Sequence, residues 1–285
     1  MSRTVWIKGD YLPEEQATVS IFDRGLLFAD AVYEGLGVLD GQIIDFAKHM
    51  ARLRRSLREI DLPEPMDQDA FFAGLMELIR RNGMYEGFLY LHITRGAHDR
   101  DYLYPKGLTP TIFAFTQAAH APAAEIRPIS LASTPDLRWV RRDIKTTNLL
   151  GQVLAKKAAE AAGADEALML DPEGFVTEGG AVSFFIVAKG RIHTRPLAGD
   201  ILPGITRSSL LEVAAEMGLA VTDERVSLEQ VYAADEAFVT GASSYVEPVG
   251  QVDGRTIGSG TVGPVTLALR EAYLKAARAS FYKAA

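Results

Sequence analysis

Cysteine is absent from all 285 residues of the chain. This absence excludes disulfide bonds, thiolate nucleophiles and zinc or iron–sulfur centres held by cysteine. The five histidines lie far apart, and neither an H-x-x-x-H nor an H-E-x-x-H pair occurs that would begin a metal site. We therefore expect chemistry that uses no metal.

Other motifs and segments are also missing. The sequence has no G-x-S-x-G and no phosphate loop that ends in Gly-Lys-Ser/Thr. No run of about 18 apolar residues could cross a membrane, and the start MSRTVWIKGDYLP lacks the apolar stretch of a signal peptide. Lys and Arg number 30 against 37 Asp and Glu, which gives a net charge of −7 without any basic block. We expect a cytoplasmic protein that binds a small metabolite, with neither a nucleic acid nor a membrane as partner.

What is present is typical of a folded protein. Hydrophobic residues make up 48% and charged residues 24% of the chain, enough to build a core under a mixed surface. A length of 285 residues exceeds the size at which a single core usually stops growing. The Ala- and Pro-rich stretch at 118–128 is the most plausible linker. We expect a small N-terminal domain, 1–119, and a larger domain, 120–285.

The N-terminal part mixes hairpins and helices. Alternating apolar residues around Gly-Asp turns predict hairpins, and apolar residues at helical spacing predict helices. The expected elements are hairpins at 4–13 and 31–46, helices at 47–62 and 67–81, and strands at 87–96 and 109–117. A polar loop at 97–108 separates the last two strands, and its length makes it a candidate for function. This order predicts a small α/β domain.

The C-terminal part reads as a meander of strands with helices between them. The expected elements are strands at 129–133 and 137–145, a helix at 149–163, strands across 166–196, a helix at 201–218 and a last helix from about residue 264. The helix at 149–163 is rich in Ala, Leu and Lys and closes at Gly163. We expect a mostly antiparallel, barrel-like sheet with helices, which makes the whole chain α+β.

Four motifs, in this order, resemble the class IV aminotransferases, which bind pyridoxal 5′-phosphate (PLP) in fold type IV. They are D-I-K-T-T-N-L-L-G at 143–151, E-A-L-M-L-D with V-T-E-G at 166–179, L-P-G-I-T-R at 202–207 and F-V-T-G-A-S-S at 238–244. The resemblance covers nearly the whole chain. It is greatest to the D-amino-acid transaminases, with L-R-W-x-R-x-D-I-K at 137–145 as a further match.

The resemblance implies that Lys145 is the catalytic residue and forms a Schiff base with PLP. An aldehyde cofactor requires an amine nucleophile, and lysine supplies one that can also carry a proton. Without the motifs around it, Lys145 would be interpreted as an ordinary surface lysine. The resemblance also implies that Glu178 contacts the pyridine nitrogen of the cofactor, and it suggests that Arg138 contacts the 3′-oxygen.

The cofactor phosphate requires hydrogen-bond donors and positive charge. Arg52 matches the phosphate-binding arginine of the family, and its planar guanidinium suits a dianion. Ile205 and Thr206 open a helix after Gly204, where free N–H groups and the helix dipole would face a phosphate. The resemblance implies a second backbone contribution from Gly241 and Ala242.

Substrate recognition is expected from Tyr33, Arg100 and Tyr102. Tyr33 and Arg100 match positions that bind the substrate carboxylate in D-amino-acid transaminases, Arg100 from across a dimer interface. That family has Arg-x-His, whereas this chain has Tyr102 at the third position. Arg-x-Tyr also occurs in the aminodeoxychorismate lyases, but the catalytic threonine of those lyases would fall at Gly35 here.

We therefore expect a homodimeric transaminase with its active sites at the interface. The expected reaction moves an amino group between a D-amino acid, such as D-alanine or D-glutamate, and a 2-oxo acid. An (R)-amine transaminase, a branched-chain L-amino-acid transaminase and an aminodeoxychorismate lyase stay open on the same fold, as does a binding module that has lost the cofactor.

Overall fold

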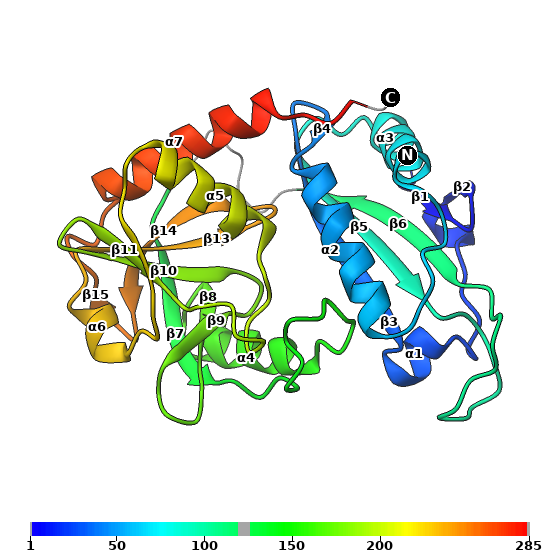
Figure 1. Ribbon diagram of the computed structural model, residues 1–285, viewed down its shortest axis with the longest axis horizontal. Helices are drawn as coiled ribbons and strands as arrows, with labels where there is room; N and C mark the ends of the chain where they lie inside the picture. Colours follow the sequence, from blue (N-terminus) through cyan, green and yellow to red (C-terminus); the bar gives the residue numbers. More distant parts are fainter. Residues whose placement is uncertain (1, 119–125, 284–285) are drawn as a thin grey trace. The chain divides into compact units, whose positions relative to one another are not determined.

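The computed structural model describes residues 2–118 and 126–283, which form two compact units (Figure 1). The first unit consists of Met1–Pro122, Ile144–Asn148 and Ser280–Ala285, and the second of Ala123–Asp143 and Leu149–Ala279. The boundary expected near residue 120 and most of the expected linker lie outside the described residues. The sequence did not predict that residues 144–148 return to the first unit.

The first unit is built on an antiparallel sheet with the strand order β2-β1-β6-β5-β3-β4. Its strands are β1 (Thr4–Ile7), β2 (Asp10–Pro13), β3 (Ala31–Leu39), β4 (Gln42–Ile43), β5 (Gly87–Thr94) and β6 (Thr111–Gln117). Its helices are η1 (Glu14–Gln16), α1 (Arg24–Phe28), α2 (Phe46–Glu59) and α3 (Gln68–Arg81). Both hairpins and both long helices confirm the expectation from sequence.

One face of this sheet carries the core. On β5, Leu89 and Leu91 are fully buried against apolar side chains of α2 and α3. Tyr90 and His92 alternate with them, and side chains in a strand alternate between faces. These two residues therefore lie on the opposite face, where Tyr90 stacks on Tyr33 with ring centroids 5.3 Å apart. The second face is aromatic.

The second unit holds a nine-stranded sheet, ordered β12-β11-β10-β13-β14-β7-β8-β9 with β15 beside β14. Its strands are β7 (Ile129–Pro135), β8 (Glu166–Leu170), β9 (Val176–Gly179), β10 (Ser183–Ala188), β11 (Arg191–Thr194), β12 (Val221–Asp223), β13 (Glu236–Gly241), β14 (Tyr245–Val252) and β15 (Arg255–Thr256). Three strand pairs are parallel and the others are antiparallel. The expectation of a mostly antiparallel sheet is confirmed, and with it the α+β fold class.

The helices of the second unit are α4 (Leu150–Ala161), α5 (Ile205–Glu216), α6 (Leu228–Tyr232) and α7 (Pro264–Ala279). α4 ends where expected, because Gly163 adopts φ +75°, a conformation that glycine reaches without steric cost. α4 packs through Ala155 and Ala159 on Ala167 and Met169 of β8.

The prediction of a strand at 137–145 is wrong. These residues form turns and bends after β7 ends at Pro135. The alternation of Leu, Trp and Val with Arg resembles a strand, but the arginine side chains bind carboxylates of the same loop. Arg138 donates to Asp136, and Arg141 donates to Asp143.

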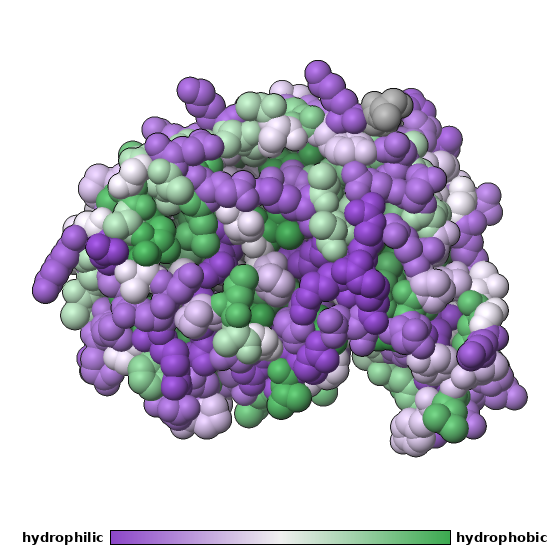
Figure 2. Space-filling model, viewed as in Figure 1, coloured by the Kyte–Doolittle hydropathy of each residue, from purple (hydrophilic) through white to green (hydrophobic). Residues whose placement is uncertain are grey.

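Hydrophilic and hydrophobic residues are interspersed on the face shown in Figure 2. Among the helices of the described residues, none combines the length and the apolar character that crossing a membrane requires.

Candidate active site

Lys145 lies in the irregular segment that belongs to the first unit. Its backbone carbonyl accepts from the Tyr33 amide at 3.0 Å, and its amide donates to Ser56 Oγ at 3.3 Å. An isolated bridge between Val32 and Thr146 fixes the same register. Lys145 is half-buried, and its Nζ lies 4.3 Å from the centroid of the Tyr33 ring. β3 therefore brings together two of the residues expected in the site, Lys145 and Tyr33.

The opposite side of β3 carries a buried charged cluster of Glu34, His49 and Arg52. Arg52 donates from Nε to Glu34 Oε1 at 2.9 Å and from Nη2 to Oε2 at 2.7 Å. His49 Nδ1 lies 2.6 Å from Oε2. His49 and Arg52 are three residues apart on α2 and so face the same way. Both carboxylate oxygens of Glu34 are occupied.

The pKa values of Glu34 and His49 follow from burial and from the charged groups beside them. Burial alone raises the pKa of Glu34, but the charge and hydrogen bonds of Arg52, with help from His49, lower it to about 2. Burial lowers the pKa of His49, and the hydrogen bond to Glu34 only partly opposes that effect. His49 is therefore neutral near pH 7 and donates from Nδ1 to the ionised Glu34.

Arg100 and Tyr102 lie on the exposed loop between β5 and β6. The Arg100 guanidinium is 5.4 Å from the centroid of Phe28 and 5.5 Å from that of Tyr102. The buried Arg24 holds the loop, because it donates to the carbonyls of Asp101 and Tyr102 at 2.5 and 3.2 Å. The structure thus brings Arg100 and Tyr102 together around Phe28.

In the second unit, Glu178 lies on β9 and is only 5% exposed. Its Oε1 accepts from Arg138 Nη1 and from the Leu202 amide at 3.2 Å. Among the residues that the structure describes, no hydrogen bond reaches Oε2. Burial raises the pKa of Glu178 although the charge of Arg138 opposes it. The side chain is a buried acceptor with one oxygen still open.

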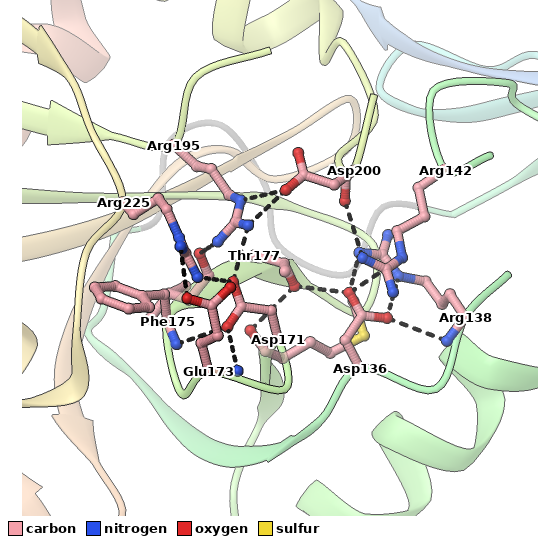
Figure 3. Close-up of polar contacts among 12 residues, drawn as sticks. Asp136, Arg138, Arg142, Asp171, Glu173, Phe175, Thr177, Arg195, Asp200 and Arg225 are labelled. Atoms are coloured by element: carbon pink, nitrogen blue, oxygen red, sulfur yellow. Dashed lines mark hydrogen bonds and ion pairs between the residues drawn. The ribbon is translucent and has the colours of Figure 1, made fainter. Parts of the chain in front are cut away.

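Arg138 belongs to a network of ion pairs and hydrogen bonds. Figure 3 shows it beside Asp136, whose side chain also accepts from Thr177 Oγ1 at 2.8 Å. Asp136 Oδ2 lies 3.5 Å from Arg142 Nε, and Arg142 Nη1 donates to the backbone carbonyl of Asp200 at 3.4 Å. The chain of contacts ends with Arg195, Asp171, Arg225 and Glu173. It runs from buried Glu178 to side chains at the surface of the second unit.

The start of α5 forms a cradle with the ends of β10 and β13. Gly204 is the N-cap and contributes no side-chain hydrogen bond, so the first amides of the helix keep their donors. A Cβ at Gly204 would lie 2.7 Å from Ser183 Oγ, so a larger residue here would require that hydroxyl to move. Ser183 pairs across the sheet with Thr240, whose Oγ1 is buried without a partner among the described residues. The adjoining Gly241 is equally tight, since its Cβ would lie 2.8 Å from Ser244 Oγ.

This cradle suits a phosphate group. Ile205 and Thr206 are buried at the helix N-terminus, where free amides and the helix dipole favour an anion. The unpartnered hydroxyl of Thr240 adds a donor. The expected residues Gly241 and Ala242 follow it directly at the end of β13.

Comparison with known proteins decides the family. The family model described as amino-transferase class IV matches residues 31–252, which is most of the chain. The chain belongs to the class IV aminotransferases. This family uses PLP. The residues present here fit that cofactor, because the cradle offers donors to its phosphate and Glu178 has one oxygen open for its ring nitrogen.

Individual relatives cover nearly all of this aminotransferase. A D-alanine aminotransferase of Bacillus licheniformis is 36% identical over 263 residues, 92% of this chain and 93% of its own. One of Staphylococcus haemolyticus is 35% identical over 273 residues, 95% and 96% of the two chains. The crystal structure of a T.th. branched-chain amino acid aminotransferase with pyridoxamine 5′-phosphate superposes with a TM-score of 0.88. It is 31% identical and covers 97% of this chain and 94% of that one.

Sequence reasoning missed several polar residues of this aminotransferase. Asp136 follows β7 directly, and Glu34 interrupts an otherwise apolar strand, which is a signal that could have been read. His49 lies at helical spacing from Arg52. Ser183 and Thr240 gave no signal, because only the sheet register brings them together.

Proposed function

We propose that this class IV aminotransferase moves an amino group between a D-amino acid of the D-alanine or D-glutamate type and a 2-oxo acid. The observation that carries the proposal is Arg100, an exposed arginine that forms no ion pair among the described residues and lies on a loop fixed by Arg24. A guanidinium binds a carboxylate through two hydrogen bonds and so orients the α-carbon. Two D-alanine aminotransferases at 35% and 36% identity support the choice.

PLP, when bound, supplies an aldehyde that reacts with amines and a ring that delocalises the electron pair left by the departing α-proton. Lys145 is the amine that we propose attaches it and then moves the proton at the substrate α-carbon. The Tyr33 ring, 4.3 Å away, covers this amine. Among the described residues no carboxylate forms an ion pair with Nζ, so the amine is available to react.

The other residues bind and orient. Glu178 offers Oε2 to the ring N–H, and the amides of Ile205 and Thr206, with Gly241 and Ala242, hold the phosphate. We propose that Arg52 also contacts the phosphate. Its Nε and Nη2 donate to Glu34, and this pair of bonds fixes the plane of the guanidinium.

Two further residues have proposed roles at the site. Arg138 donates to Asp136 and Glu178, which favours a role beside the ring nitrogen in place of the expected contact with the 3′-oxygen. Tyr102 can donate one hydrogen bond to a substrate carboxylate but carries no positive charge.

A second candidate is a branched-chain L-amino-acid transaminase. It is favoured by the 0.88 TM-score to the T.th. enzyme. D-alanine, L-leucine and (R)-1-phenylethylamine, each tested with 2-oxoglutarate as the amino acceptor, separate the candidates. We expect turnover of D-alanine, and faster turnover of L-leucine would overturn the assignment.

The attachment site is tested by borohydride reduction and peptide mapping. We expect the pyridoxyl group on Lys145 and none on Lys145→Ala protein. A tag on another lysine would refute the central role of Lys145.

Arg100 is tested by subunit mixing, because we propose a homodimer in which Arg100 serves the partner's site. Arg100→Ala should raise KM for D-amino acids strongly. If Arg100 acts across the interface, mixed Lys145→Ala and Arg100→Ala subunits regain activity, since each mixed dimer contains one intact site. Mixtures without regained activity place Arg100 in its own subunit's site, and an unchanged KM removes its role.

A further inference from the structure

Asp136 and Arg138 form a buried pair joined by three hydrogen bonds. Asp136 accepts from Arg138 Nε at 2.9 Å, from Nη2 at 2.6 Å and from the Arg138 amide at 3.1 Å. Its side chain is fully buried, and that of Arg138 is 5% exposed. Two parallel bonds between a carboxylate and a guanidinium fix the plane of the arginine.

The backbone of Arg138 is held as well. A Cβ on Gly151, in the first turn of α4, would lie 3.0 Å from the Cα and Cγ of Arg138. A larger residue at position 151 would press on the backbone and side chain of Arg138, so glycine permits this close packing without a shift. Thr177 Oγ1 holds Asp136 from β9, the strand that also carries Glu178.

This fixed guanidinium directs Nη1 at one oxygen of Glu178. Oε1 then has two donors, Arg138 and the Leu202 amide, while Oε2 has none among the described residues. A carboxylate held in this way presents Oε2 as its only open acceptor. Asp136 shares the positive charge of Arg138, so Glu178 remains a strong acceptor.

We propose that Asp136 and Arg138 are positioning residues that aim Glu178 Oε2 at the cofactor ring nitrogen. The inference rests on the proposed function, because it takes Glu178 as the partner of that nitrogen. Neither residue needs to touch the cofactor. Both act through Glu178.

The test is the dissociation constant of PLP, measured by dialysis of the holoenzyme and absorbance of the released cofactor. Removing a partner behind a ligand-binding group costs about 10- to 100-fold in metal sites, and we expect Asp136→Asn and Arg138→Met to weaken PLP binding by a similar factor. Arg225→Met is the matched control. It removes an arginine from the exposed end of the same network, where Arg225 contacts Asp171 and Glu173. We expect it to change the constant less than twofold.

A double-mutant cycle separates positioning from a merely structural effect. If Arg138 acts through Glu178, Arg138→Met adds no further loss to Glu178→Gln. Additive losses, or no loss in either single variant, would overturn the inference. Asp136→Asn keeps the shape of the side chain and decides the question if Arg138→Met does not fold. Borohydride labelling of wild-type protein keeps the two hypotheses apart: an unlabelled Lys145 refutes the proposed function, whereas a labelled Lys145 with an additive cycle refutes only the positioning pair.

Discussion

Glu34 in the first unit and Glu178 in the second are both buried glutamates on strands, and they differ in how they are bonded. Glu34 is fully buried, and Arg52 and His49 occupy both of its oxygens. Glu178 is 5% exposed and has donors on Oε1 alone among the described residues. The pKa of Glu34 falls to about 2, whereas burial raises that of Glu178.

This difference distinguishes a structural carboxylate from one that awaits a ligand. A buried charge costs free energy unless it is paired and hydrogen-bonded. For Glu34, hydrogen bonds and charge within the protein offset the free energy of burial. For Glu178, they offset only part of it. A ring N–H would supply the missing donor, so we expect Glu34 to matter for stability and Glu178 for cofactor chemistry.

The largest effect is expected from Glu34→Gln. The change leaves the Arg52 guanidinium buried without its counter-charge, which typically costs about 3–5 kcal/mol in the free energy of unfolding. Urea unfolding followed by circular dichroism measures it. Glu77→Gln is the control, because Glu77 makes exposed ion pairs with Arg80 and Arg81 whose loss should change stability far less. Equal losses in the two variants would remove the distinction.

The pH dependence of stability should separate the two glutamates next. Glu34 has a pKa of about 2 in the folded protein and an ordinary value of 4.5, so its contribution is complete above pH 4.5 and is lost as the pH falls toward 2. The difference amounts to about 3 kcal/mol. The raised pKa of Glu178 acts in the opposite direction, since its contribution is present below pH 4.5 and is lost as the pH rises through the folded value.

Urea unfolding at pH 7, 4.5 and 3 checks this opposition. The deficit of Glu34→Gln relative to wild type should shrink as the pH falls. The difference between Glu178→Gln and wild type should move the other way. Curves that run parallel at all three values would contradict the assignment.

Glu178→Gln should affect catalysis more than folding. The loss of one oriented electrostatic partner costs about 100-fold or more in rate. Stability should change by about 1 kcal/mol or less, because Asp136 still pairs Arg138 and the amide still accepts a hydrogen bond. Steady-state kinetics and urea unfolding of the same preparation measure both. Unchanged kinetics with a loss as large as that of Glu34→Gln would reverse the roles.

Much of the fold could be read from the sequence because its signals are local. The turn at Gly9, the apolar face of α2 and the glycine after α4 each predict an element without reference to the rest of the chain. The prediction of a strand at 137–145 was wrong because the arginines of this segment bind nearby carboxylates. Its alternating pattern therefore did not indicate a strand. The return of residues 144–148 to the first unit depends on bonds to β3 and α2 that no local pattern encodes.

The site could be predicted only where motifs carry it. The resemblance pointed to Lys145 and Glu178, but nothing in the sequence shows that Glu178 has one open oxygen. Arg138 was expected at the cofactor, and the structure shows in addition that it donates to Asp136 and Glu178. Partners of this kind are set by packing between distant segments, so they become visible only in three dimensions.

The smallest effect is expected from His49→Leu, which removes one hydrogen bond to Glu34 and leaves the Arg52 pair in place. Because burial lowers the pKa of His49, its ring is neutral near pH 7, and losing one such bond costs about 1 kcal/mol. The unfolded chain protonates His49 below about pH 6.5, which the folded protein resists. Wild-type stability therefore loses part of its advantage as the pH falls, and the deficit of the variant should be smaller at pH 5.5 than at pH 8. A deficit that grows toward pH 5.5 would mean that His49 is a cation paired with Glu34, and the neutral donor assigned to this cluster would be wrong.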